Sequence, residues 1–140
     1  MTTPSSTTTA PARWLLLGDS HAACIGQAAR AAGLPFAGGP VGSGRDFLGP
    51  FFDADGAEIR FRAPEGARLY REFLDALGLA SMSELSVPVV CTFGFSAHTV
   101  AKRQNWDIHR DPRGDFAASF LGSPYFSALV RATVRGTLAF

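Results

Sequence analysis

The sequence predicts an α/β domain built around a short parallel sheet. A continuous apolar run at 14–17 ends in a Gly-Asp-Ser-His turn, and an alanine-rich stretch at 22–32 follows it. This order is typical of a buried strand, a tight turn and a helix. A second strand is expected at 34–37, and an apolar, β-branched run at 87–93 predicts a third buried strand. Strand, helix and strand in succession, with an apolar first strand, indicate parallel pairing.

The length and composition favour one domain. The chain has 140 residues, of which 46% are hydrophobic, so residues 13–140 are enough for a single core. Residues 1–12 are rich in Thr, Ser and Pro, and we expect a disordered leader there. Because this leader has no basic start and no apolar segment, it does not resemble a signal peptide. The apolar run at 14–17 is too short to cross a bilayer, and a cytoplasmic protein without a membrane span is expected.

Charge and cysteine content exclude several partners. The 13 basic and 12 acidic side chains give a net charge of +1, and the arginines are scattered among the acids, so no nucleic acid partner is expected. Cys24 and Cys91 are too few for a disulfide framework or a metal cluster. We expect both to be small buried hydrophobes in a reduced compartment. Since no nucleotide-binding fingerprint is present either, neither a cofactor nor a metal is predicted.

The middle of the chain predicts a loop, a hairpin and a helix. Five glycines make 38–50 a loop. The segment 51–62 is expected to form a hairpin with Asp55-Gly56 at the turn. Apolar residues at four-residue spacing make 65–79 an amphipathic helix.

The last predicted element is a helix that starts at Pro124, with Ser123 as its N-cap. Its expected apolar face comprises Phe126, Leu129, Val130, Thr133, Val134 and Leu138. Three strands leave a sheet edge open. We therefore expect the domain to be the N-terminal part of a larger fold, or to form a homo-oligomer through that edge.

The sharpest signal for chemistry is the segment Leu17-Gly18-Asp19-Ser20-His21. A serine between a buried strand and a helix exposes its hydroxyl at the edge of the sheet where α/β ligand sites lie. Its backbone N–H, at the helix N-terminus, can also face a developing oxyanion. The alternative is that Asp19 or Ser20 simply caps the helix.

Gly18-Asp19-Ser20-His21 resembles the first conserved block of the SGNH (GDSL-type) hydrolases, and is similar to the Gly-Asp-Ser-His form found in bacterial SGNH domains. The resemblance covers blocks between residues 14 and 98. It implies a flavodoxin-like three-layer α/β/α sandwich, with Ser20 as nucleophile and its N–H in the oxyanion hole. Asp19 and His21 are then expected at the pocket, although His21 would equally suit the surface.

Two further blocks of the family have counterparts here. The glycine that donates an N–H to the oxyanion corresponds to Gly44, with Gly42 as the second choice, unless these glycines serve only the loop conformation. Arg45 beside them is placed to meet an anionic group of a substrate. The family's Gly-x-Asn block falls on Gly94 and Ser96, so a shorter hydroxyl donor stands where the asparagine belongs.

The family's last block, Asp-x-x-His, is absent from the sequence. His98, just past the third strand, is the candidate base, unless that histidine lies on a further C-terminal segment. Asp107 and His109 have the right residue types at the wrong spacing. The resemblance implies a serine esterase acting on an O-acyl ester of a small molecule, carbohydrate or lipid. The alternative is a non-catalytic α/β binding module, or a truncated fragment that lacks the Asp-His pair.

Overall fold

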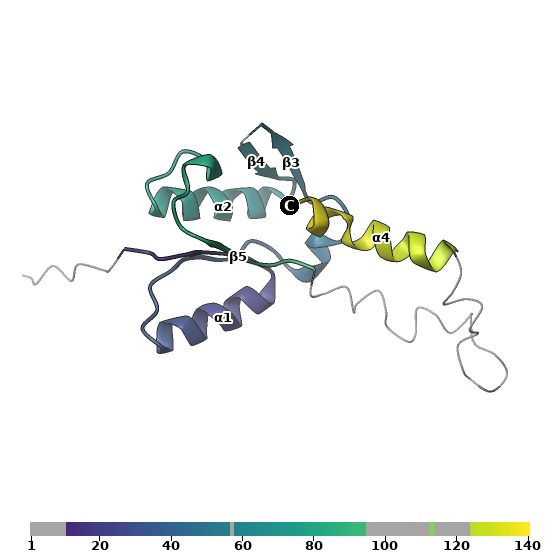
Figure 1. Ribbon diagram of the computed structural model, residues 1–140, viewed down its shortest axis with the longest axis horizontal. Coiled ribbons are helices and arrows are strands. Elements are labelled where there is room, and N and C mark those ends of the chain that lie inside the picture. Colours follow the sequence, from purple (N-terminus) through teal and green to yellow (C-terminus); the bar gives the residue numbers. More distant parts are fainter. Residues whose placement is uncertain (1–10, 57, 95–112, 114–123) are drawn as a thin grey trace, which may run out of the picture.

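The computed structural model of the protein describes residues 11–56, 58–94, 113 and 124–140, and Figure 1 shows their arrangement. In chain order the elements are β1 (Leu15–Gly18), α1 (Ser20–Ala31), β2 (Ala37–Pro40), the 3-10 helix η1 (Gly44–Phe47), β3 (Phe52–Asp55), β4 (Glu58–Phe61), α2 (Pro64–Ala76), the 3-10 helix η2 (Met82–Glu84), β5 (Val89–Thr92) and α4 (Pro124–Ala139). No helix of this part is long and apolar enough to cross a membrane.

The prediction of a mixed α/β fold with a short parallel sheet is confirmed. The sheet has the order β2-β1-β5, and Leu15 at its centre pairs with Ala37 on one side and Val89 on the other. The strand order reverses at β1, because β2 lies on one side of it and β5 on the other. Helices α1 and α2 cover opposite faces of the sheet (Figure 1).

Alternation along β1 divides its side chains between the two faces. Leu15 and Leu17 belong to the main core, on the side of α2 and the hairpin, and Leu16 faces α1 at Gly26. The main core comprises Leu15, Leu17, Val41, Phe47, Phe51, Phe61, Tyr70, Leu74 and Phe93. Helix α1 approaches the sheet closely because the residues that it buries are small: Ala22, Gly26 and Ala29.

The predicted hairpin is confirmed. Strands β3 and β4 pair antiparallel, with Phe52 opposite Phe61, and Gly56 adopts a φ of +60° beside the turn. Glycine reaches this left-handed conformation without the steric penalty of a side chain. Helix α2 begins with Pro64 in its first turn and buries Gly66, Tyr70 and Leu74 against the core.

Helix α4 begins at Pro124 as predicted, and its expected N-cap, Ser123, lies outside the described residues. Of the expected apolar face, Phe126, Thr133 and Val134 are partly buried. Leu129, Val130 and Leu138 are exposed. The helix instead contacts the rest of the domain through its last turns, where Gly136 is buried and Phe140 packs among the aromatic rings of the core. An apolar spacing shows which residues share a helix face, but the neighbouring elements decide which part of that face is covered.

The second strand was also misplaced. The prediction put it at 34–37 and gave the following glycines to a loop, whereas β2 spans Ala37–Pro40 and Leu34 is 50% exposed. Gly38 has a φ of +95°, and a Cβ there would lie 2.1 Å from the carbonyl oxygen of Leu16. Only glycine allows the backbone to approach β1 so closely.

The third strand is not buried in the way the sequence predicted. β5 lies at an edge of the sheet, and Val89 and Val90 are 38% and 39% exposed. The prediction that both cysteines are buried was wrong as well, since Cys24 and Cys91 are exposed. A β-branched run indicates a strand, but its place in the sheet depends on pairing with strands distant in the sequence.

Candidate active site

The three parallel strands end side by side. Gly18 of β1 pairs with Pro40 of β2 and with Thr92 of β5. The N–H of Val41 donates to the carbonyl oxygen of Gly18 at 2.9 Å, so the loop after β2 starts beside the end of β1. In open α/β sheets ligands bind outside this carboxyl edge, where the strand order reverses. Ser20 lies at this edge, separated from β1 by Asp19 alone.

Asp19 is the N-cap of α1 and is completely buried, whereas Ser20, the first residue of the helix, is exposed. The capping interpretation is therefore confirmed for Asp19, and Ser20 is not the cap. Capping does not compete with a role for Ser20 at the site. It fixes the start of the helix and so holds the N–H of Ser20 at the helix N-terminus, where the backbone carries partial positive charge.

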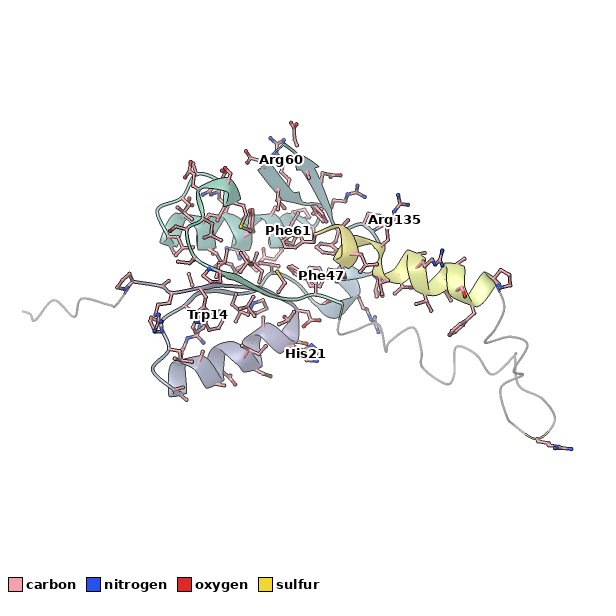
Figure 2. The ribbon with its side chains drawn as sticks, in the orientation of Figure 1. Trp14, His21, Phe47, Arg60, Phe61 and Arg135 are labelled. Atoms are coloured by element: carbon pink, nitrogen blue, oxygen red, sulfur yellow. The ribbon has the colours of Figure 1, made fainter. Side chains whose placement is uncertain are left out.

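His21 is bound to Asp19 by two contacts. One oxygen of the Asp19 carboxylate, Oδ1, accepts from the backbone N–H of His21 at 2.9 Å and lies 2.8 Å from the ring nitrogen Nδ1. The side chain of His21 is 49% exposed, and Figure 2 shows it beside the N-terminal end of α1. The ring therefore lies at the protein surface next to Ser20, and this position fits both alternatives that the sequence allowed.

The loop that was expected to supply the second oxyanion donor is held by its own side chains. Asp46 Oδ2 accepts from the N–H of Ser43 at 2.7 Å and from its hydroxyl at 2.9 Å. Gly44 then starts η1, and a Cβ on Gly42 would lie 3.0 Å from the same Asp46 oxygen. Arg45 is exposed. Both glycines therefore lie in a tightly bonded turn, which accounts for their conformation whether or not an N–H faces a substrate.

An aromatic contact connects this turn to the end of β5. The rings of Phe47 in η1 and Phe93 lie 4.8 Å apart, and Phe51 makes an edge contact with Phe47 at 5.0 Å. All three rings are nearly buried. The sequence analysis did not identify this aromatic contact, although the phenylalanines in and just after the glycine-rich loop were a visible signal for it.

Thr92 is a second residue that sequence reasoning missed. It is 2% exposed, and its hydroxyl has no hydrogen-bond partner among the described residues. A Cβ on Gly18 would lie 1.7 Å from that hydroxyl oxygen. Gly18 therefore makes room for the Thr92 side chain between β1 and β5. A polar residue at the end of an apolar strand run was the signal that pointed to it.

The remaining predicted site residues lie at or beyond the end of the described segment. Gly94 has a φ of +84°, and a Cβ there would lie 2.9 Å from the hydroxyl oxygen of Thr137 in α4. Its backbone conformation and its packing both require glycine. Ser96, His98 and His109 fall outside the described residues, so the structure does not place the predicted base or the third oxyanion donor.

Other features of the described part lie away from this edge. A cavity of about 280 Å³ opens between β4, α2 and η2, with Ile59, Tyr70 and Met82 in its wall. Within the described ranges no three His, Cys, Asp or Glu side chains are grouped so that they would hold a metal ion.

The fold and the site define the chain as an α/β protein with a serine at the carboxyl edge of its parallel sheet. Comparison with protein-family models, with curated proteins and with solved structures finds no match.

Proposed function

We propose that this protein is a serine esterase of the SGNH type, which hydrolyses an O-acyl ester of a small molecule, carbohydrate or lipid with Ser20 as nucleophile. The observation that carries the proposal is the position of Ser20. It is exposed, it begins α1, and only the buried N-cap Asp19 separates it from the central strand.

The reaction follows from these groups. Ser20 Oγ attacks the ester carbonyl carbon, the bond from that carbon to the alcohol oxygen breaks, and the serine proton passes through a base to the leaving alcohol. Water then attacks the acyl-serine, which releases the carboxylic acid and restores Ser20. Charge on the carbonyl oxygen is stabilised by the N–H of Ser20 and, in this proposal, by Gly44 and Ser96.

Arg45 favours substrates that carry an anionic group. Its side chain is exposed on η1, the helix that follows the strand next to β1. If it binds such a group, Arg45→Ala weakens binding of acidic esters and leaves neutral esters unchanged. Equal affinity of the variant for acidic esters would remove this part of the proposal.

The test is labelling with a fluorophosphonate probe, together with hydrolysis of p-nitrophenyl acetate. We expect the wild-type protein to be labelled, and Ser20→Ala to lose the label and to reduce turnover more than about 10³-fold. Ser83→Ala is the matched control, because Ser83 is also an exposed serine in a helical turn but belongs to η2. Labelling that persists in Ser20→Ala, or a folded wild type that is never labelled, would contradict the proposal.

The second candidate function is a non-catalytic binding module that assembles through the sheet. The observation that favours it is the exposed apolar edge of β5 at Val89 and Val90. No described strand pairs with that edge, so its backbone groups can accept a strand from a second copy. This candidate predicts a dimer in light scattering and no labelling of Ser20, whereas a labelled monomer contradicts it.

A further inference from the structure

The contact between Asp19 and His21 has a chemical consequence because Ser20 lies between these two residues. The carboxylate of Asp19 is fully buried and accepts two hydrogen bonds through one oxygen, from the backbone and from the ring of His21. Capping the helix requires only the backbone contact. The ring contact is additional, and it fixes the orientation of the imidazole at the rim of the site.

The same contact determines which ring nitrogen is basic. A carboxylate accepts hydrogen bonds and donates none, so the proton of a neutral His21 lies on Nδ1. The lone pair then lies on Nε2, on the opposite side of the ring. A carboxylate that holds the Nδ1–H of a histidine, and thereby its tautomer and orientation, is the arrangement that prepares the base in serine hydrolases.

The sequence provides no Asp-x-x-His pair for this role, and the structure shows an aspartate bonded to a histidine beside the serine itself. We infer that His21 is the general base for Ser20 and that Asp19 is its positioning residue. This inference rests on the proposed function. It replaces His98 as the base and makes the three consecutive residues after β1 a complete set of nucleophile, base and orienting carboxylate.

The route of the proton follows from helix geometry. Successive residues of an α-helix point about 100° apart, which follows from 3.6 residues per turn, so the side chains of Ser20 and His21 diverge. A general base can act through one bridging water. The proton leaves Ser20 Oγ for that water as the water passes a proton to Nε2, and the imidazolium returns a proton to the leaving alcohol.

The test compares three variants by their rate of fluorophosphonate labelling near neutral pH. His21→Gln is expected to slow labelling about 10²–10⁴-fold near neutral pH, as for other general bases. His98→Gln tests the competing assignment, because the family resemblance had placed the base at His98.

Asp19→Asn separates positioning from folding. Asparagine caps helices about as well as aspartate, so the melting temperature should stay close to that of the wild type. Labelling should nevertheless fall, because the amide no longer holds the Nδ1–H tautomer as a carboxylate does. A residue with a purely structural role would show the opposite pattern, with changed stability and unchanged labelling.

The outcomes distinguish this inference from the proposed function. If the folded wild type is never labelled at Ser20, the proposed function is wrong, and this inference with it. If Ser20 is labelled and His21→Gln labels at the wild-type rate, only the base assignment is wrong. Loss of labelling in His98→Gln with the wild-type rate in His21→Gln would return the role to His98.

Discussion

Gly136 in α4 provides a test of how this helix docks. In an exposed helix position, replacing glycine by alanine stabilises a protein by about 1 kcal/mol. Here we expect the opposite sign. A Cβ on Gly136 would lie 2.0 Å from the carbonyl oxygen of Gly49 and 2.7 Å from the ring of Phe51. The first neighbour is backbone, so the helix has to move by more than 1 Å to reach an ordinary contact distance of about 3.4 Å.

The cost of that movement can be estimated from the contacts of the last turns. The N–H of Gly49 donates to the carbonyl oxygen of Thr133 at 3.0 Å, a bond that contributes about 1 kcal/mol. The ring of Phe140 lies 4.8 Å from Phe93 and 5.2 Å from Phe52, and each aromatic pair contributes about 0.5–1.5 kcal/mol. Losing these contacts outweighs the gain in helix propensity, and Gly136→Ala should lower the free energy of unfolding by about 1–3 kcal/mol.

The assay is urea denaturation followed by circular dichroism, with Ser127→Ala as the control in the same helix. Ser127 is exposed, so its replacement should change the free energy of unfolding by less than about 0.5 kcal/mol. If Gly136→Ala leaves the free energy of unfolding unchanged or raises it, while Ser127→Ala leaves it unchanged, α4 does not pack against Gly49 in solution, and the reasoning is refuted.

Two predictions concern ionisable groups outside the site. Although Cys91 is exposed as a whole residue, partial desolvation of its thiol raises the pKa of that group. In a Cys24→Ser variant the remaining thiol should therefore react with iodoacetamide at pH 8 more slowly than glutathione does, and an equal or faster rate would contradict this. The Arg62 guanidinium, hydrogen-bonded to Asp53, holds the pKa of that carboxyl below its ordinary value of 3.8. Because the folded pKa is the lower one, the pair stabilises the protein above the unfolded pKa and this contribution is lost as the pH falls through the folded pKa. NMR titration of the carboxyl should show a higher Asp53 pKa in Arg62→Gln and an unchanged one in Arg131→Gln. If the Asp53 pKa is unchanged in both variants, the ion pair is absent in solution.

The elements that sequence reasoning placed correctly are those with a strong local signal. The apolar run before Gly18 predicted β1, the Asp55-Gly56 turn predicted the hairpin, and Pro124 predicted the start of α4. Each depends on the conformational preference of a few neighbouring residues, which is written in the local sequence. The position of Ser20 after β1 follows from the same local pattern.

The errors occurred where a segment distant in the sequence determines the local structure or its burial. Glycines at 38–39 were assigned to a loop, because only their pairing with β1 makes them part of a strand. The valines of β5 were expected to be buried, because nothing in the strand itself shows that it lies at an edge of the sheet.

The sequence by itself determined an α/β fold with a parallel sheet and placed a serine between its first strand and helix, because strand, turn and helix preferences act over a few residues. Only the tertiary structure decided which strand is central, which glycines lie against another backbone, and that the carboxylate of Asp19 turns inward to cap α1 and bind the His21 ring. These outcomes depend on packing and hydrogen-bond geometry in three dimensions. A sequence pattern shows which residues are available for such contacts, and the folded chain shows which contacts are made.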